Sequence, residues 1–283
     1  MGEGIQILAQ PFLMCLILTG IHTYLGIHVL GREVIFVDLA LAQIAALGAT
    51  AAFLFGYPLD STGAYGFSLA FTLLGACVFS LTRSDERSFS QEAVIGICYA
   101  MAAAAVIVIL DRAPQGAEHL RYLLVGNILT VQWAEIGTTG AAYLGIGLFH
   151  WAFRRRFLLL TFAPGEAVRM GVHPRVWDFL FYASFGFVVT SSVRIAGVLL
   201  VFTYLIVPAF AAMLLVEGVG RRLLLGWVLG LIGSLVGLGL SYGWDLPTGA
   251  AVVCTFGGLL VVAVLWRRIR VGRGGLRPPG ARP

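Results

Sequence analysis

The stretch "AGVLLVFTYLIVPAFAAMLLV", from Ala196 to Val216, contains no charged side chain. A helix needs roughly 20 consecutive apolar residues to cross the hydrocarbon core of a bilayer, which is about 30 Å thick. A segment that crosses alone must satisfy its own backbone hydrogen bonds, so the helix is the secondary structure open to it. The stretch therefore predicts a transmembrane helix.

Windows of the same kind recur along the chain and predict an all-α polytopic membrane protein. They lie near residues 7–29, 34–56, 63–82, 91–110, 133–153, 177–194, 223–243 and 248–266. The first window and the pair across 177–216 are the least regular, so we expect eight or nine transmembrane helices. A mean hydropathy of +0.91 and a charged fraction of 12% agree, because soluble domains are typically about one quarter charged.

The distribution of the basic residues predicts the orientation. All 19 are arginines, and if the carboxyl terminus is cytoplasmic only Arg112, Arg121 and Arg194 lie on the outer side. Such an excess on one side is typical of cytoplasmic loops. We expect residues 1–266 to form a transmembrane domain, and residues 267–283 to form a disordered, basic cytoplasmic tail that touches anionic lipid. The arginines form no patch with interleaved aromatic residues, so nucleic acid is not an expected partner.

Motifs of the common enzyme classes are missing from the sequence. A phosphate-binding loop of the P-loop type needs a lysine, and the chain contains none, so any ATP hydrolysis belongs to a separate subunit. Neither G-x-S-x-G nor H-E-x-x-H occurs. We therefore expect a transport subunit without a bound cofactor, not an enzyme.

Polar residues inside the spans are the candidates for a substrate pathway, because a charge near the bilayer centre costs about 2.5–3.5 kcal/mol. In "VDLALAQIAALGAT" (Val37–Thr50), Asp38 either lines such a pathway or caps its helix, and Gln43 either contacts substrate or joins helices. His22 and His28 are either ligands or packing residues. Being six residues apart, they do not share a helical face.

Other polar and small residues have structural interpretations. Glu92, Glu135 and Asp178 stand near helix starts, where a carboxylate favours the positive end of the helix dipole, so we expect them to cap. Pro208 should kink or unwind its helix. A series of small residues at spacings of three and four predicts close helix packing. The series consists of Gly226, Gly230, Gly233, Ser234 and Gly237.

A long inner connection, "RRRFLLLTFAPGEAVRMGVHPRVW" (Arg154–Trp177), separates two of the spans. After Pro164, the segment "GEAVRMGV" has an acidic residue in its first turn and a glycine at a plausible end, which predicts a short helix. Such a helix is either a docking element or a simple amphipathic connector.

Several of these stretches, taken in order, resemble the membrane permease subunits of bacterial zinc/manganese/iron-type ABC importers. "VGNILTV" (Val125–Val131) is similar to the family's outer-loop F-G-N-I-L segment, and "AGVLLVFTYLIVPAFAA" (Ala196–Ala212) to its proline-containing helix. "LSYGWDLPTGA" (Leu240–Ala250) is similar to the S-Y-x-x-D-x-P-x-G-A segment, and "QEAVIGICYAMAAA" (Gln91–Ala104) to the start of the fourth helix. The matches run from about residue 20 to about residue 265.

The resemblance implies a type II ABC importer-like permease in the bacterial inner membrane, which imports zinc, manganese or iron at the expense of ATP. It also implies a second permease copy, with a homodimer the expected form. The remaining implied partners are a cytoplasmic ABC ATPase subunit, which holds the ATP, and an extracytoplasmic metal-binding protein. The metal would be cargo and not a cofactor of this chain.

The inner loop acquires a role from the same resemblance. "FAPGEAVRMGV" (Phe162–Val172) is similar to the family's F-D-P-E-F-A-x-x-x-G-V coupling helix, which sits in a groove of the ATPase. The family's aspartate is replaced by Ala163, and its Glu-Phe pair by Gly165 and Glu166. The residues expected to form the coupling helix are Pro164, Glu166, Ala167, Arg169, Met170 and Gly171, within a coupling loop of residues 154–176.

The metal pathway departs from the family pattern. Members carry D-x-x-x-H in the second helix, followed five residues later by glycine, and the resemblance implicates these two side chains in metal coordination. Anchoring on Gly48 puts Gln43 in place of the histidine and Leu39 in place of the aspartate, while Asp38 is displaced by one residue, or about 100° around the helix.

Three explanations of this departure remain open. Asp38 and Gln43 form a weaker oxygen-based relay, which is our preferred hypothesis, or His22 or His28 supplies a nitrogen ligand, or the substrate differs from the family norm. An alternative function is an ion- or proton-coupled secondary transporter that uses Asp38. A membrane-embedded enzyme would need catalytic side chains clustered at one depth, and the sequence shows no such cluster.

Overall fold

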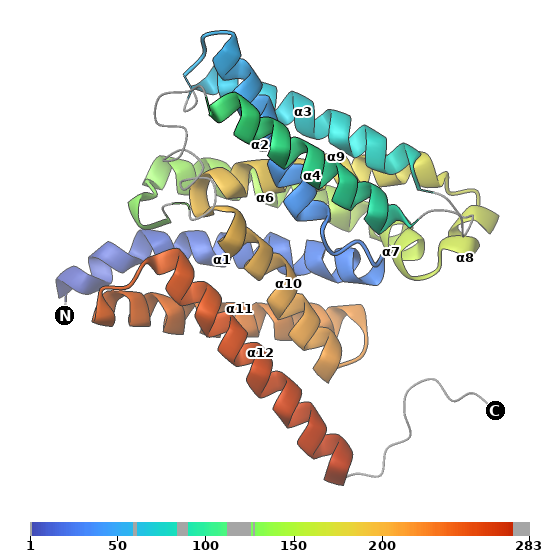
Figure 1. Cartoon of the computed structure of the whole chain (residues 1–283). Helices are drawn as coiled ribbons and strands as arrows, with labels where there is room; N and C mark the ends of the chain where they lie inside the picture. Colours follow the sequence, from blue (N-terminus) through green and yellow to red (C-terminus); the bar gives the residue numbers. More distant parts are fainter. Residues whose placement is uncertain (1, 59–60, 84–89, 112–125, 127, 274–283) are drawn as a thin grey trace.

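The computed structural model describes residues 2–58, 61–83, 90–111, 126 and 128–273, and within this part every regular element is a helix (Figure 1). The elements are α1 (Gly2–Gly31), α2 (Val37–Leu54), α3 (Thr62–Leu81), α4 (Gln91–Leu110), η1 (Ile128–Thr130), α6 (Trp133–Ala152), α7 (Arg154–Phe162), α8 (Pro164–Arg169), α9 (Pro174–Ala196), α10 (Val198–Leu215), α11 (Val219–Trp244) and α12 (Thr248–Arg273).

Eight of the described helices are long and apolar enough to cross a membrane, namely α1, α2, α3, α4, α9, α10, α11 and α12. The ninth expected window, near residues 133–153, is present as α6, a 20-residue helix that carries Glu135 and His150 and is not among these eight. The expectation of an all-helical polytopic membrane protein with eight or nine spans is confirmed.

The helices form two packed groups that meet along the middle of the bundle (Figure 1). In one group α2 packs against α3 and α4, and α3 packs against α9; in the other α1 and α12 pack against α10 and α11. Contacts of α1 with α6 and of α9 with α10 join the groups. As a result, 67% of the span in α1 is buried inside the chain, compared with 22% of the span in α4.

The small residues of α11 allow close approach to its two neighbours, as the sequence predicts. All five of them are buried. A Cβ added at Gly230 would lie 2.3 Å from Thr19 of α1, and one added at Gly237 would lie 2.6 Å from the backbone of Val252 in α12. Small residues favour association in a membrane because they let helix backbones approach each other, where dispersion contacts are made. The expectation of close packing is confirmed.

The contact between α1 and α10 is the tightest of the helix crossings. A Cβ added at Gly26 would lie 1.9 Å from the backbone carbonyl oxygen of Leu205. α10 continues as a helix through Pro208, so it is not unwound there. Proline has no N–H for the carbonyl of Tyr204, and a bend at Pro208 stays a prediction.

α12 leaves the bundle at its carboxyl-terminal end and projects alone beyond the other helices (Figure 1). It continues to Arg273, past the boundary at residue 266 where we expected the tail to begin. Residues 274–283 of the expected tail lie outside the described part of the chain. Val261, Val262, Leu265 and Trp266 are each more than half exposed.

The contact at Gly26 predicts a large difference between two alanine substitutions in α1. Gly26→Ala should destabilise the protein by about 1–3 kcal/mol, because the added methyl group meets backbone and not a movable side chain. Gly20→Ala is the matched control, since nothing lies within 4 Å of its added Cβ and alanine is the better helix former. Thermal unfolding of the detergent-solubilised protein measures both, and equal midpoints for the two variants would contradict the packing described here.

Candidate functional site

A buried carboxylate joins three helices at the end of the bundle that carries α7 and α8. Asp178, in α9, has a side chain with 0% exposure. Its Oδ1 accepts a hydrogen bond of 2.7 Å from Nη1 of Arg32, which follows α1, and its Oδ2 accepts one of 2.5 Å from Nη1 of Arg83, which follows α3. The Arg32 side chain is only 4% exposed and its guanidinium lies 4.0 Å above the ring of Phe181. We call Asp178, Arg32 and Arg83 the ion triad.

The ion triad also holds the last turn of α7. Nε of Arg32 donates to the hydroxyl oxygen of Thr161 at 3.1 Å, and Nη2 of Arg83 donates to the backbone carbonyl of Leu160 at 3.3 Å. Nδ1 of His28, in α1, forms a 2.7 Å hydrogen bond with the same Thr161 hydroxyl. The two arginines that hold Asp178 thus also bind two consecutive residues of α7: Arg83 binds Leu160 and Arg32 binds Thr161.

Aromatic side chains pack α7 against the helices on either side. Phe157 has 0% exposure and its ring stacks on His150 of α6 at a centroid distance of 4.3 Å. The ring of Trp177 in α9 meets Phe157 edge to face at 5.5 Å. His150 is satisfied on both nitrogens, by Tyr24 at 3.3 Å and Ser184 at 2.8 Å. The expected inner loop is therefore an ordered part of the fold.

α8 is the short helix that the sequence predicts after Pro164. It is attached through Ala167, which has 0% exposure, while Val168 and Met170 are 50% and 64% exposed. The helix ends with the amide of Gly171 bound to the carbonyl of Val168, and that of Val172 bound to Ala167, both at 3.0 Å. Gly171 has a φ of +76°, which glycine adopts without strain. Apolar side chains at this helix therefore face outward from the chain.

Glu166 and Arg169 are the exposed polar residues of α8. Nε of Arg169 donates to the carbonyl of Gly165 at 3.3 Å, inside the same helix. Neither side chain forms an ion pair within the described residues. Both charged groups are thus available to a partner.

Unlike Asp178, the carboxylates of Asp38 and Glu92 each have one oxygen without a hydrogen-bond partner. Asp38 lies in the first turn of α2 and is 2% exposed, and its Oδ1 is buried without a hydrogen-bond partner. In α4, Oε1 of Glu92 accepts a 3.1 Å bond from the amide of Phe36, while its Oε2 is buried without a partner. An unpaired buried oxygen costs free energy, and neither carboxylate recovers that cost for its second oxygen within the described residues.

The other predicted pathway residues are dispersed. Gln43 is partly buried in α2. His22 and His28 have 0% exposure in α1, where Nδ1 of His22 bonds to the carbonyl of Leu18 at 2.9 Å and His28 bonds to Thr161. Among the residues described, no three His, Cys, Asp or Glu side chains gather closely enough to hold a metal ion. A complete metal site would therefore need further donors.

At the opposite end of the bundle, two of the sequence motifs shape the connections between helices. Gly126, with a φ of +64°, lies against the Ala196–Gly197 junction that separates α9 from α10, and an added Cβ would lie 2.2 Å from the carbonyl carbon of Ala196. Between α11 and α12, the hydroxyl of Ser241 lies 2.7 Å from that of Thr248, and Asp245 adopts a left-handed conformation. At this end, both motifs therefore hold neighbouring segments of backbone in close contact.

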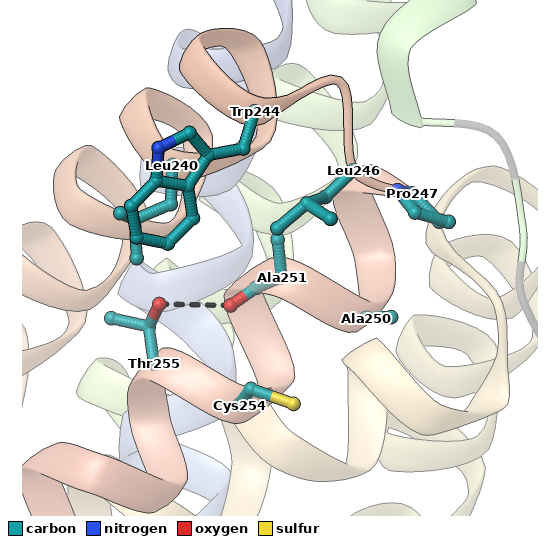
Figure 2. Close-up of a pocket in the computed structure, with 8 residues that line it drawn as sticks. All are labelled: Leu240, Trp244, Leu246, Pro247, Ala250, Ala251, Cys254 and Thr255. Carbon is teal, nitrogen blue, oxygen red and sulfur yellow. Dashed lines mark hydrogen bonds between the residues drawn. The ribbon is translucent and has the colours of Figure 1, made fainter.

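An apolar groove between α11 and α12 is shown in Figure 2. Its volume is about 400 Å³. The lining residues are Leu240, Trp244, Leu246, Pro247, Ala250, Ala251, Cys254 and Thr255. The hydroxyl of Thr255 donates to the carbonyl of Ala251 at 2.8 Å, so the groove offers no free polar group there. It has no donor set for an ion and is not part of the candidate site.

Three acidic residues had been expected to cap helices, and the structure confirms this for one of them. Glu135 accepts from the amide of Gln132 at 3.0 Å in a capping box at the start of α6. Glu92 does lie in the first turn of α4, although its Oε1 bonds to the amide of Phe36 before α2. The expectation was wrong for Asp178, which binds two arginines. One signal in the sequence could have indicated the ion pairs of Asp178: Arg32, Arg83 and Asp178 were all expected near the inner side of the membrane.

The chain has clear relatives among known proteins. The model of the ABC 3 transport family matches residues 4–267. A protein of Haemophilus influenzae named "Probable iron transport system membrane protein" is 28% identical over 233 residues, covering 82% of this chain and 83% of the relative. The "Manganese transport system membrane protein MntB" of Synechocystis is 27% identical over 266 residues, which cover 93% of this chain and 81% of the relative.

A solved structure shares the fold. It is titled "PsaBC from Streptococcus pneumoniae in complex with Fab", and one of its chains superposes with a TM-score of 0.75 at 22% identity. The superposition covers 92% of this chain and 93% of that one. The arrangement of helices described above is therefore an established one.

The unpaired oxygen of Asp38 predicts an unusual stability effect. Asp38→Asn keeps the shape and ends the burial of an acidic group that has no counter-charge within the described residues, so it should stabilise the solubilised protein by about 1–3 kcal/mol. Asp178→Asn is the contrasting control, because both Asp178 oxygens are paired, and breaking a buried ion pair costs about 3–5 kcal/mol. Thermal unfolding midpoints measure both changes, and a lowered midpoint for Asp38→Asn would show that Asp38 has a partner.

Proposed function

Since this chain belongs to the ABC 3 transport family, we propose that it is the membrane-spanning permease subunit of an ATP-driven importer of divalent transition metal ions. The names of two relatives, which describe iron and manganese transport, support the substrate class. The observation in the structure that carries the proposal is α8, a short helix that is attached by one buried residue and presents apolar side chains outward.

The exposure of α8 is the reason to propose an ATPase as its partner. Val168 and Met170 lie in a loop that the arginine distribution places in the cytoplasm, where exposed apolar area is unfavourable. A groove on an ATPase subunit would cover them, and Glu166 and Arg169 would pair with charges on its rim. The ATPase supplies ATP hydrolysis, which fits a chain without lysine or a phosphate-binding loop.

The proposed topology follows from the same assignment. The α7–α8 end, with Arg154, Arg155 and Arg156, is cytoplasmic and so is the carboxyl terminus. The opposite end, closed by Gly126 on the α9–α10 junction, receives metal from an extracytoplasmic binding protein. The membrane is the bacterial inner membrane, and a second copy of the chain completes the transporter as a homodimer. The exposed turns of α12 lie in lipid or against that copy.

We assign the metal pathway to Asp38 and Gln43. Both offer oxygen, a donor that suits manganese better than zinc. The buried, unpaired Oδ1 of Asp38 supports this assignment, and the free Oε2 of Glu92 adds a further acidic oxygen at the start of α4. His28 is engaged by Thr161, which makes it the less suitable ligand, while Nε2 of His22 is buried and unpaired. A weak oxygen site fits transport, since the ion must leave as well as bind.

The mechanism that follows is movement of the permeases by their ATPases. Closure of the ATPase pair on ATP displaces α8, and the two permeases rock about a shared central pathway so that the ion passes from the outer to the inner side. The chain supplies the pathway and the docking helix, while the chemical step takes place on the partner.

Uptake by the reconstituted complex tests the function. Liposomes that contain the chain with its ATPase should accumulate Mn²⁺ when ATP is supplied, and less Zn²⁺, Fe²⁺ or Co²⁺. Gln43→Leu should lower Mn²⁺ uptake about tenfold without changing assembly, because it removes a side-chain oxygen from the pathway. Uptake by the chain alone, without nucleotide, would instead support a secondary transporter.

Docking by α8 makes a separate prediction. The double variant Glu166→Ala with Arg169→Ala should release the ATPase during purification, or leave ATP hydrolysis without metal uptake. Glu217→Ala with Arg221→Ala is the matched control, because it removes an exposed acid from the α10–α11 connection and an exposed base from the first turn of α11. An intact and fully coupled complex with altered α8 would contradict the docking assignment.

A further inference from the structure

We propose that Asp178 is a positioning residue, and that the ion triad around it transmits movement of the α7–α8 loop to three membrane helices. This inference rests on the proposed function, because it concerns how a displacement of α8 reaches the pathway. It adds a defined set of side chains that would carry the displacement, none of which touches the ion.

The connectivity of the ion triad is the first argument. Arg32 bonds at one end to Asp178 of α9 and at its Nε to Thr161 of α7, and Arg83 bonds to Asp178 and to Leu160 of α7. Each arginine therefore connects α7 with α9. Because Arg32 follows α1 and Arg83 follows α3, a movement of α7 reaches both groups of the bundle through these side chains.

The stiffness of the ion triad is the second argument. Hydrogen bonds between charged groups are short and directional, and they are stronger in a buried site than in water. The exposed fractions of the Asp178 and Arg32 side chains are 0% and 4%. Separating Arg32 from Asp178 would leave a guanidinium group in the protein interior without its anion, so these two groups move together, while Arg83, with a side chain 18% exposed, adds a second link.

The aromatic contacts of α7 show why the polar bonds matter. Phe157 packs between His150 and Trp177, and these contacts fix the orientation of its ring. They involve no member of the ion triad, so the hydrogen bonds at Leu160 and Thr161 are what tie α7 to the triad. Loss of the Thr161 hydroxyl should leave the fold intact but loosen the transmission.

Thr161 offers a clean test, because valine has nearly the same shape and no hydroxyl group. The complex of the chain with its ATPase is placed in liposomes, and Mn²⁺ uptake and phosphate release are measured in the same sample. Thr161→Val removes the hydroxyl that bonds to both His28 and Arg32, so it should lower the Mn²⁺ moved per ATP by at least about fivefold, the factor that corresponds to the loss of a single hydrogen bond. Thr161→Ser should restore the ratio. Thr255→Val is the control, since that hydroxyl bonds only within α12.

The outcomes separate this inference from the function on which it rests. An unchanged ratio for Thr161→Val, whether uptake and hydrolysis both persist or both fall, would overturn the inference and leave the function intact. Asp178→Asn in an assembled complex should lower the ratio further, because both arginines lose their partner. A wild-type complex that shows no ATP-dependent Mn²⁺ uptake would overturn the proposed function itself.

Discussion

Asp178 carries a negative charge that two arginines share, its side chain is fully buried, and the arrangement of the α7–α8 end depends on it. A carboxylate in such a place is stable only if its charge and its lone pairs are both satisfied, and the two guanidinium groups meet both needs. They come from the connections after α1 and after α3, so the ends of these helices cannot separate from α9. Nε of Arg32 and Nη2 of Arg83 then hold α7, and α7 packs against α8.

The middle of the bundle is built on a different principle. Hydrophobic burial between helices provides little net gain in a lipid environment, so contact area and close approach must supply the stability. The glycines of α11 and Gly26 of α1 serve this purpose, and hydroxyl pairs such as Tyr204 with Ser234, 2.7 Å apart, add directional links between helices. The protein thus combines a charged, rigid end with a closely packed apolar interior.

Most of the fold could be predicted from the sequence, because spanning helices are specified locally by length and hydropathy. The small residues of α11 and the glycine that ends α8 were also visible, since their spacing within one helix carries the information. The partners of Asp178 were not, because Arg32 and Arg83 are 146 and 95 positions away in the chain, and no local pattern links them. For the same reason, the hydrogen bond between Phe36 and Glu92, which are 56 positions apart, could not be predicted from the sequence. The unpaired oxygen of Asp38 could be recognised only when its surroundings were known.

The burial of α1 bears on how the chain is made. This helix has the largest buried fraction of the eight spans, yet its neighbours α10 and α11 lie near the far end of the chain and are synthesised long after it. Until they arrive, the face of α1 that packs Thr19 against Gly230 and Thr23 against Gly226 of α11 has no partner helix to cover it. Biogenesis therefore requires that the first span be sheltered, by the insertion machinery or by loose association with the early helices, while the carboxyl-terminal half is still being translated.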